Sequence, residues 1–231
     1  PIVEPTEAAI LEKAAEFSTL RADCVEWRID CFKGAKSLPA IVHCAAKLRV
    51  ALKDKLLLFT FRTKSEGGKV ALARKEYLHF IRTVLATDCA DLIDIEFFTA
   101  GAELPALIEE AHTAGAAVVC SSHDFHKTPP RAELVNRMVA MQQAGADLPK
   151  LAVMPQSRTD VLELLAATAE MADRHPETPI ITMSMGALGA VSRLSGEALG
   201  SAMTFANPGQ ASAPGQVSLE VVNEVLDALH L

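Results

Sequence analysis

Short runs rich in β-branched and aromatic residues alternate with longer helical patterns along the whole chain, and few folds accommodate such an order. Strands are expected at residues 1–3, 24–29, 56–61, 92–97, 116–123, 147–155, 180–185 and 202–205. Helical patterns follow them at residues 6–18, 38–50, 71–87, 102–114, 131–144, 159–174, 190–194 and 219–229. Eight successive strand–helix units without a linker predict an α/β protein, a closed parallel (β/α)8 TIM barrel, with one domain over residues 1–231.

Residues with known preferences for helix ends support these boundaries. Thr6 is placed to cap the first helix, and Glu7 suits the positive end of its dipole. Gly115 and Gly145 stand where two of the expected helices end, a position that favours glycine. The alternative is a doubly wound open sheet, but the Gly-rich fingerprint that such sheets carry after the first strand is missing.

Composition narrows the class of protein. Half of the residues are hydrophobic, which allows a large core, and no apolar run is long enough to predict a membrane span. The net charge of −7 gives no reason to expect nucleic acid or an acidic membrane as a partner. Five cysteines without a CxxC pair or a secretory signal indicate reduced thiols and a cytoplasmic location.

One lysine stands in an otherwise apolar strand pattern between Pro149 and Pro155. Lys150 shares a face with Ala152 and Met154, and no residue of the segment offers it a counter-charge. Loss of hydration favours the neutral amine, which is a nucleophile and can form a Schiff base with a ketone. The alternative is a lysine at a strand end whose ammonium group reaches solvent.

The expected strand at residues 24–29 carries charges on one face. Val25 and Trp27 share one face, and Glu26 and Arg28 share the other. In a barrel the bulky apolar face packs under the helices, which directs Glu26 and Arg28 inward. Charges are rarely buried without partners, so this face indicates either a polar functional site or an internal ion pair.

Further side chains of interest recur at or near the carboxyl ends of other strands, where (β/α)8 barrels place their chemistry. They are Arg62, Asp94, Glu96, His123, Met183, Met185 and the following Arg193. The repeated placement favours an active site over chance. The two methionines fit equally well as core residues or as pliable walls for a ring-shaped ligand.

Two competing interpretations of His123 are weaker. Ser122, His123 and Asp124 are consecutive in a strand, so their side chains point in opposite directions and cannot relay a proton as a catalytic triad does. His123 and His126 lack a third ligand at a suitable spacing, so no metal site is predicted.

Several motifs together resemble the type I 3-dehydroquinate dehydratases, a family of class I aldolase-like barrels. The resemblance extends in order over nearly the whole chain. The motifs that carry it are EWRID at 26–30, FTFRT at 59–63, SEGG at 65–68, SHDFHKTP at 122–129, the run at 145–156, IITMSM at 180–185, VSRL at 191–194 and ASAPGQ at 211–216.

The resemblance implies dehydration of 3-dehydroquinate to 3-dehydroshikimate in the shikimate pathway of aromatic amino acid biosynthesis, without metal or organic cofactor. It implies that Lys150 is the Schiff-base lysine, His123 the general acid/base, and Glu66 the glutamate that orients the histidine. The implied substrate-binding residues are Glu26, Arg28 and Arg62 for hydroxyls and Arg193, Ser212 and Gln216 for the carboxylate. Asp94 and Glu96 match an acidic pair that supports the site. The implied partners are a small anionic substrate and a second copy of the chain in a homodimer.

In the implied mechanism, Lys150 forms an iminium with the ring ketone, and His123 moves the proton. The loop at 206–216, which contains two Gly and two Pro, is predicted to be a lid. A Schiff-base class I aldolase-type lyase remains the alternative, because it shares the barrel and the lysine. A non-catalytic binding barrel would not need a nucleophile and a base together. Family members begin upstream with a short hairpin, which is expected to be absent before Pro1.

Overall fold

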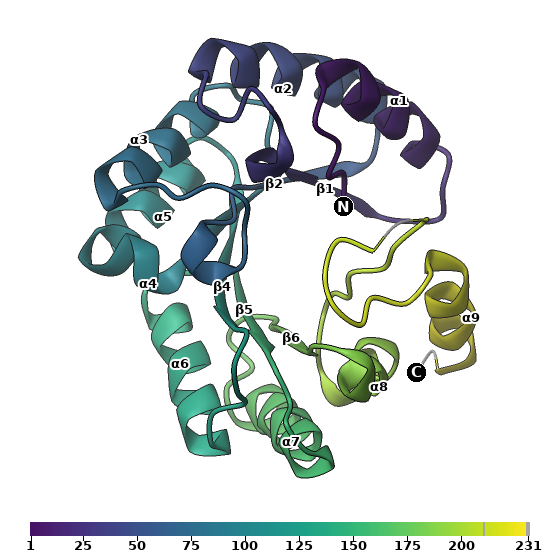
Figure 1. Cartoon of the computed structure of the whole chain (residues 1–231). Helices are drawn as coiled ribbons and strands as arrows, with labels where there is room; N and C mark the ends of the chain where they lie inside the picture. The colour runs from purple at the N-terminus through teal and green to yellow at the C-terminus, as the bar shows by residue number, and fades with distance from the viewer. Residues whose placement is uncertain (210, 230–231) are drawn as a thin grey trace. The chain divides into compact units, whose positions relative to one another are not determined.

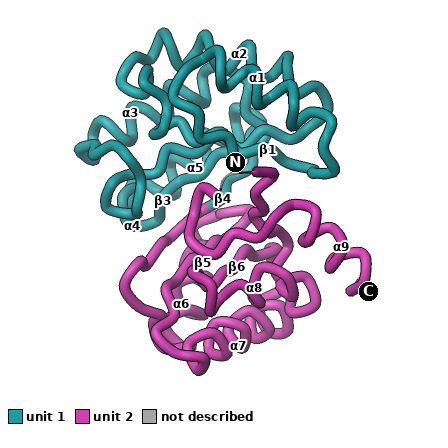
Figure 2. Tube along the Cα trace, turned by 45° about the vertical axis from the view of Figure 1, so that its right-hand side comes forward, with its two compact units in different colours: residues 1–119 teal, residues 120–231 magenta. Residues whose placement is uncertain are grey.

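The computed structural model describes residues 1–209 and 211–229 (Figure 1). They group into two compact units, Pro1–Val119 and Cys120–Leu231, which are coloured separately in Figure 2. Strands are labelled β, α-helices α, and the short 3-10 helices η.

Unit 1 alternates strands and helices from its first residues onward. Its elements are α1 (Glu7–Phe17), β1 (Cys24–Arg28), η1 (Ile29–Cys31), α2 (Leu38–Leu52), β2 (Leu56–Thr60), η2 (Lys64–Glu66), α3 (Arg74–Leu85), β3 (Leu92–Glu96), α4 (Phe97–Ala100), η3 (Gly101–Glu103), α5 (Leu104–Thr113) and the start of β4 (Ala117–Asp124). β2 pairs in parallel with both β1 and β3. Helices α1, α2, α3 and α5 lie along one side of these strands (Figure 1).

Unit 2 continues the same alternation. After the end of β4 it contains α6 (Arg131–Gln143), β5 (Leu148–Val153), α7 (Arg158–Arg174), β6 (Ile181–Ser184), η4 (Ala187–Gly189), α8 (Ala190–Leu194), η5 (Glu197–Leu199) and α9 (Leu219–Leu229). β5 and β6 pair in parallel, with Lys150 opposite Ile181. Helices α6 and α7 pack against each other and against β5 and β6, respectively.

The six strands are neighbours in chain order within one sheet, β1-β2-β3-β4-β5-β6. This order of parallel strands with intervening helices is that of a TIM-like barrel, and the predicted fold class is confirmed. The first expected strand is reduced to a single parallel bridge between Ile2 and Trp27.

The expected eighth strand at residues 202–205 is wrong, because these residues form no strand. Only a single parallel bridge joins Ser201 to Ile180, with a hydrogen bond from Ala202 N to Ile180 O at 2.8 Å. The hydroxyl oxygen of Ser201 accepts the N–H of Thr182 at 3.1 Å. The Ser201 side chain therefore accepts the backbone N–H of Thr182, which would donate to a backbone carbonyl if a longer strand paired here.

Aromatic packing in unit 1 fixes which strand faces lie under the helices. Trp27 is fully buried, and its ring meets that of Phe59 edge-on at a centroid distance of 5.5 Å. Phe61, just after β2, packs on Phe80 of α3 at 4.6 Å. Because side chains alternate along a strand, this packing turns Glu26 and its neighbours in phase to the opposite face, as predicted.

Helix ends follow the predicted signals. Thr6 Oγ1 accepts a hydrogen bond from Ala9 N, and Gly115 and Gly145 adopt positive φ angles of 77° and 98° after α5 and α6. A side chain at these two glycines would strain the backbone, which explains the residue type.

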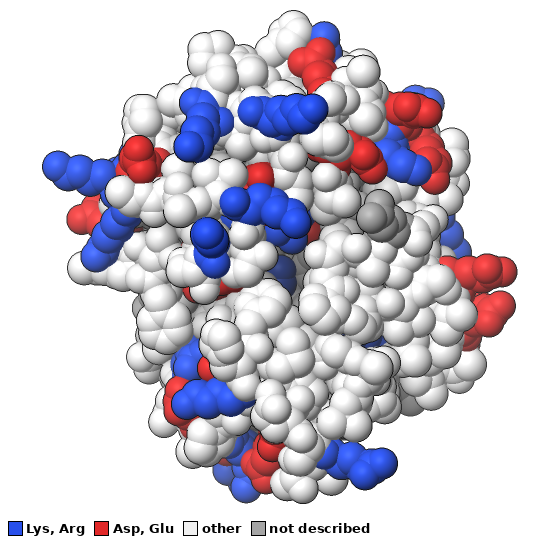
Figure 3. Space-filling model, viewed as in Figure 1, with Lys and Arg blue, Asp and Glu red and all other residues white. Residues whose placement is uncertain are grey.

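The surface carries charges of both signs, which are interspersed on the face shown in Figure 3. Among residues 1–209 and 211–229, no helix combines the length and the hydrophobicity that crossing a bilayer requires. None of the five cysteines, all of which lie within this described part, forms a disulfide.

Candidate active site

The charged residues predicted at the strands of unit 1 are held by polar or charged partners. Thr60 Oγ1 donates to Glu26 Oε1 at 2.8 Å. Arg62, two residues beyond β2, donates from Nη2 to Asp94 at 2.6 Å and from Nη1 to Glu96 at 3.0 Å. Asp94 and Glu96 are fully buried and Arg62 is 4 % exposed. Arg62, Asp94 and Glu96 therefore form a buried ion-pair network, and a functional role for this part of unit 1 stays a prediction.

Neighbouring carboxylates keep Arg62 firmly cationic. Burial alone would lower its pKa, but the charges of Asp94, Glu96 and Glu66 outweigh burial and raise the pKa above its ordinary value. Glu66 Oε2 lies 3.6 Å from Arg62 Nη1. The guanidinium is thus a fixed positive centre within an acidic surrounding.

Glu96 is held by donors from two further segments. Thr63 donates to it from its backbone N at 2.8 Å and from its hydroxyl at 2.7 Å, and Thr99 donates at 2.6 Å. Donors from several segments fix the position of this buried carboxylate. Glu96 therefore fixes both Arg62 and the start of the loop that carries Glu66.

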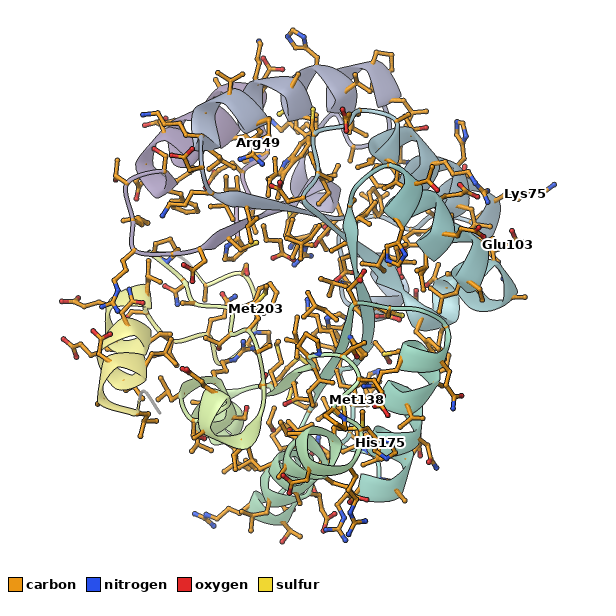
Figure 4. The ribbon with its side chains drawn as sticks, turned by 180° about the vertical axis from the view of Figure 1, so that it is seen from behind. Arg49, Lys75, Glu103, Met138, His175 and Met203 are labelled. Carbon is orange, nitrogen blue, oxygen red and sulfur yellow. The ribbon has the colours of Figure 1, made fainter. Side chains whose placement is uncertain are left out.

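Substituting Glu96 by glutamine is expected to lower the free energy of unfolding by about 1.5–3 kcal/mol, because a buried charge-assisted hydrogen bond to Arg62 is lost. Urea unfolding followed by circular dichroism measures this difference. The matched control is Glu103→Gln. Glu103 is labelled in Figure 4, and its carboxylate approaches Arg82 at 3.8 Å on the exposed surface. Equal stability losses in both variants would contradict the structural role of Glu96.

Two glycines shape the short loop that presents Glu66. Gly67 adopts a left-handed φ of 87° at the end of η2. A Cβ on Gly68 would lie 1.8 Å from the carbonyl oxygen of Arg62, so only glycine fits there. The chain folds back tightly, and Glu66 ends 6 % exposed. This geometry accounts for the Ser-Glu-Gly-Gly sequence.

Arg28 is also held in place. Its Nε and Nη2 donate to the two carboxylate oxygens of Asp30 at 2.8 and 2.9 Å. Burial, the largest influence, would lower the pKa of Arg28, but the hydrogen bonds and charge of Asp30 raise it.

In unit 2, Lys150 lies within β5 and is only 4 % exposed. Its Nζ lies 4.2 Å from the centroid of the Phe205 ring. The alternative of a lysine that extends into solvent is therefore wrong. The aromatic face attracts the ammonium form, whereas burial favours the neutral amine. Phe205 was missed, because nothing in its local pattern relates it to a lysine 55 positions earlier in the chain.

His123 lies near the end of β4, the strand next to β5 in the sheet. It is half-buried, and its ring is nearly parallel to that of Phe125, with centroids 6.4 Å apart. The carboxylate of Asp124 accepts the backbone N–H groups of His126 and Lys127 at 2.9 and 3.0 Å. Asp124 is thus engaged in its own turn, in agreement with the rejection of a Ser-His-Asp triad.

Arg193 in α8 is a buried cation, 2 % exposed. Its Nη1 donates to Met183 Sδ at 3.5 Å and its Nη2 to the carbonyl oxygen of Pro214 at 3.3 Å. Its Nε has no hydrogen-bond partner among the described residues. Burial lowers the pKa of Arg193 to about 10, with no carboxylate of the described residues opposing this effect, yet the group stays protonated at neutral pH. A buried cation in such surroundings suits an anionic ligand.

The predicted lid at residues 206–216 contacts Arg193 through the carbonyl oxygen of Pro214. Ser212 donates to Gln216 Oε1 from its backbone N at 2.6 Å and from its hydroxyl at 3.2 Å. Gly215 has a φ of 75°, and a Cβ there would lie 2.2 Å from the carbonyl oxygen of Gly186. The loop therefore rests on the turn before α8. Gln210, within the predicted lid, lies outside the described residues.

The two methionines, for which the sequence allowed core positions or the walls of a ligand site, are both buried. Met183 is 6 % and Met185 2 % exposed, and Met183 contacts Arg193. Among residues 1–209 and 211–229, no cluster of three or more His, Cys, Asp or Glu side chains could hold a metal ion.

Comparisons with known proteins agree on one family. The sequence profile of the type I 3-dehydroquinase family matches residues 1–231. A 3-dehydroquinate dehydratase from Klebsiella pneumoniae is 46 % identical over 229 residues, which are 99 % of this chain and 91 % of that protein. One from Bacillus subtilis is 46 % identical over 230 residues, 100 % of this chain and 90 % of that protein.

One solved structure has the same fold over the full length of this chain. It is the type I 3-dehydroquinate dehydratase from Clostridium difficile with covalently modified comenic acid. That structure is 42 % identical, covers 100 % of this chain and 91 % of its own, and superposes with a TM-score of 0.96. The chain belongs to the type I 3-dehydroquinase family.

Proposed function

We propose that this chain eliminates water from 3-dehydroquinate to give 3-dehydroshikimate through a Schiff base on Lys150. Its family and its relatives make it a hydro-lyase of the shikimate pathway. The observation that carries the proposed chemistry is the burial of the Lys150 amine within β5. Conversion of 3-dehydroquinate, followed by the ultraviolet absorbance of the conjugated enone product, tests the activity directly.

The proposed reaction begins at the ring ketone. The neutral amine of Lys150 adds to the carbonyl carbon, and loss of that oxygen as water leaves an iminium. Its positive charge acidifies the neighbouring C–H, and His123 accepts that proton while the electron pair forms an enamine. His123 then donates the proton to the hydroxyl at the next carbon, which leaves as water. Hydrolysis of the conjugated iminium releases product and regenerates the amine.

The remaining residues are proposed to position the substrate and the base. Glu66 orients His123. The substrate hydroxyls are bound by three charged side chains, each of which is held in place by a hydrogen bond within unit 1. That set is Glu26, Arg28 and Arg62. Met183 and Met185 line the ring, and residues 1–231 act as a single catalytic (β/α)8 domain.

Arg193, with Ser212 and Gln216, is proposed to bind the substrate carboxylate. The support is the buried guanidinium with an unpartnered Nε, together with the contact from Nη2 to the lid carbonyl of Pro214. A carboxylate would supply the missing counter-charge through a bidentate pair. The lid would then close over a neutralised site.

Arg193→Met is expected to weaken carboxylate binding by about 1.5–3 kcal/mol, the value of a charged hydrogen bond. Calorimetric titration with a hydroxylated cyclohexane carboxylate that lacks the ketone measures this loss without turnover. Because the unliganded protein carries a desolvated cation, the variant is expected to keep or raise its melting temperature. Arg174→Met, at an exposed position in the same unit, is the control and should bind the anion as the parent does. Unchanged affinity in Arg193→Met would place the carboxylate elsewhere.

A class I aldolase, the alternative that the lysine alone allows, is not favoured, because the full-length relatives are dehydratases. A non-catalytic barrel is not favoured either, since Lys150, His123 and Glu66 are all present. A cytoplasmic location, which the cysteine pattern indicates, and a homodimer, which the sequence resemblance implies, complete the proposal. Light scattering of the purified protein should give twice the mass of the chain.

A further inference from the structure

One buried carboxylate that the proposed mechanism does not use joins three separate segments of unit 1. Asp30, in η1 directly after β1, is 2 % exposed. Its Oδ1 accepts from Arg28 Nε at 2.8 Å and from the backbone N of Arg62 at 3.3 Å. Its Oδ2 accepts from Arg28 Nη2 at 2.9 Å, from the backbone N of Lys69 at 3.0 Å and from Cys31 Sγ at 3.9 Å.

The first consequence concerns the guanidinium of Arg28. A two-point pair with a carboxylate fixes both the position and the plane of a guanidinium. Among the described residues, the Arg28 guanidinium donates to Asp30 alone. Its Nη1 hydrogens therefore remain for a ligand, and their direction is set by Asp30.

The second consequence concerns the loop that carries Glu66. This loop folds back on itself through hydrogen bonds from Gly68 N to Thr63 O at 2.8 Å and from Lys64 N to Val70 O at 3.0 Å. These bonds hold its internal shape. The bond from Lys69 N to Asp30 ties the loop to the end of β1, and the bond from Arg62 N ties the end of β2 to the same carboxylate.

We propose that Asp30 is a positioning residue of the substrate site, which sets the guanidinium of Arg28 and the loop of Glu66 relative to each other. The inference rests on the proposed function, because Arg28 and Glu66 matter only if they serve the dehydratase reaction. Residues that hold site residues in place through hydrogen bonds typically change activity by about 10–100-fold when they are removed. Asp30 need not touch the substrate to have this effect.

Asp30→Asn tests the proposal, because it keeps the size of the side chain but removes the charge and turns one acceptor into a donor. We expect kcat/KM for 3-dehydroquinate to fall by roughly 10–100-fold, chiefly through KM, while borohydride still traps substrate on the protein. Asp30→Glu keeps the charge and should recover part of the loss. If Asp30→Asn does not fold, Asp30→Glu alone should show a raised KM.

Asp91→Asn is the matched control. Asp91 also joins an arginine to a strand backbone in unit 1, since it accepts from Arg49 Nη1 (Arg49 is labelled in Figure 4) and from Leu57 N at 2.7 Å. It contacts none of the proposed site residues in the described part of the chain. Asp91→Asn should therefore alter stability and leave KM at the parent value.

A double-mutant cycle with Arg28→Ala separates positioning from stability. If Asp30 acts through Arg28, the effect of Asp30→Asn on kcat/KM should be clearly smaller in the Arg28→Ala background. Independent, multiplying effects would overturn the proposal, as would a parent-like KM in Asp30→Asn. An inactive parent protein would overturn the proposed function and this inference with it, whereas an active parent with the same kcat/KM in Asp30→Asn overturns the inference alone.

Discussion

Lys150→Met is expected to lower kcat for 3-dehydroquinate by about 10⁴-fold or more, because the variant has no amine to form the iminium on which every later step depends. Methionine is apolar and unbranched, so it can replace the buried lysine beside Phe205 without a large cavity. Steady-state assays of the enone product, with protein in excess to detect slow turnover, measure the loss.

Lys55→Met is the control for this substitution. The Lys55 amine donates to the carbonyl oxygens of Leu20 and Ala22 at 2.9 and 2.6 Å and so has a structural role outside the proposed site. This control should lose stability and keep kcat. Substantial turnover in Lys150→Met would show that the reaction does not need this amine.

His123→Ala is expected to lower kcat by about 10²–10⁴-fold, the usual contribution of general acid/base catalysis. The imine with Lys150 should still form, because His123 acts after that step in the proposed sequence. Rapid-quench experiments with borohydride should therefore find the variant largely in the covalent form while product accumulates slowly. Loss of both imine formation and turnover would assign His123 an earlier role.

His175→Ala is the control for this variant. His175, labelled in Figure 4, follows α7, and its backbone carbonyl, which the substitution retains, accepts from Gln142 Nε2 at 3.0 Å. Its imidazole has no part in the proposed reaction, so kcat should remain at the parent value. An equal loss in both variants would point to a general effect on folding instead of proton transfer.

Much of the fold was predictable, because apolar residues repeat with different periods in strands and helices, and several helices carry residues that favour a helix end. The alternation of residues around Trp27 identified the face of β1 that packs on Phe59. Glu26 lies on the opposite face, where it accepts a hydrogen bond from Thr60. Gly115 and Gly145 ended their helices as their residue type indicates. These features depend on residues that are close in sequence.

The features that were missed depend on contacts between distant segments. Phe205 packs on Lys150 although its own segment, expected to be a strand, forms none. The Ser201 hydroxyl replaces a ladder bond there, and no local pattern distinguishes a serine that does so. Asp30 carried a signal, since it alternates in phase with Arg28, but its bond to the backbone of Lys69 depends on tertiary structure. The local pattern of residues predicts which side chains share a face of a strand, whereas the contacts between distant segments depend on tertiary packing.

Reduction with borohydride in the presence of 3-dehydroquinate tests the central claim most directly, since it converts the transient imine into a stable secondary amine. Peptide mass spectrometry then locates the modified residue. The account predicts substrate-dependent inactivation with a single adduct on Lys150. An adduct on a different lysine, or full activity with no adduct under conditions of turnover, would contradict it.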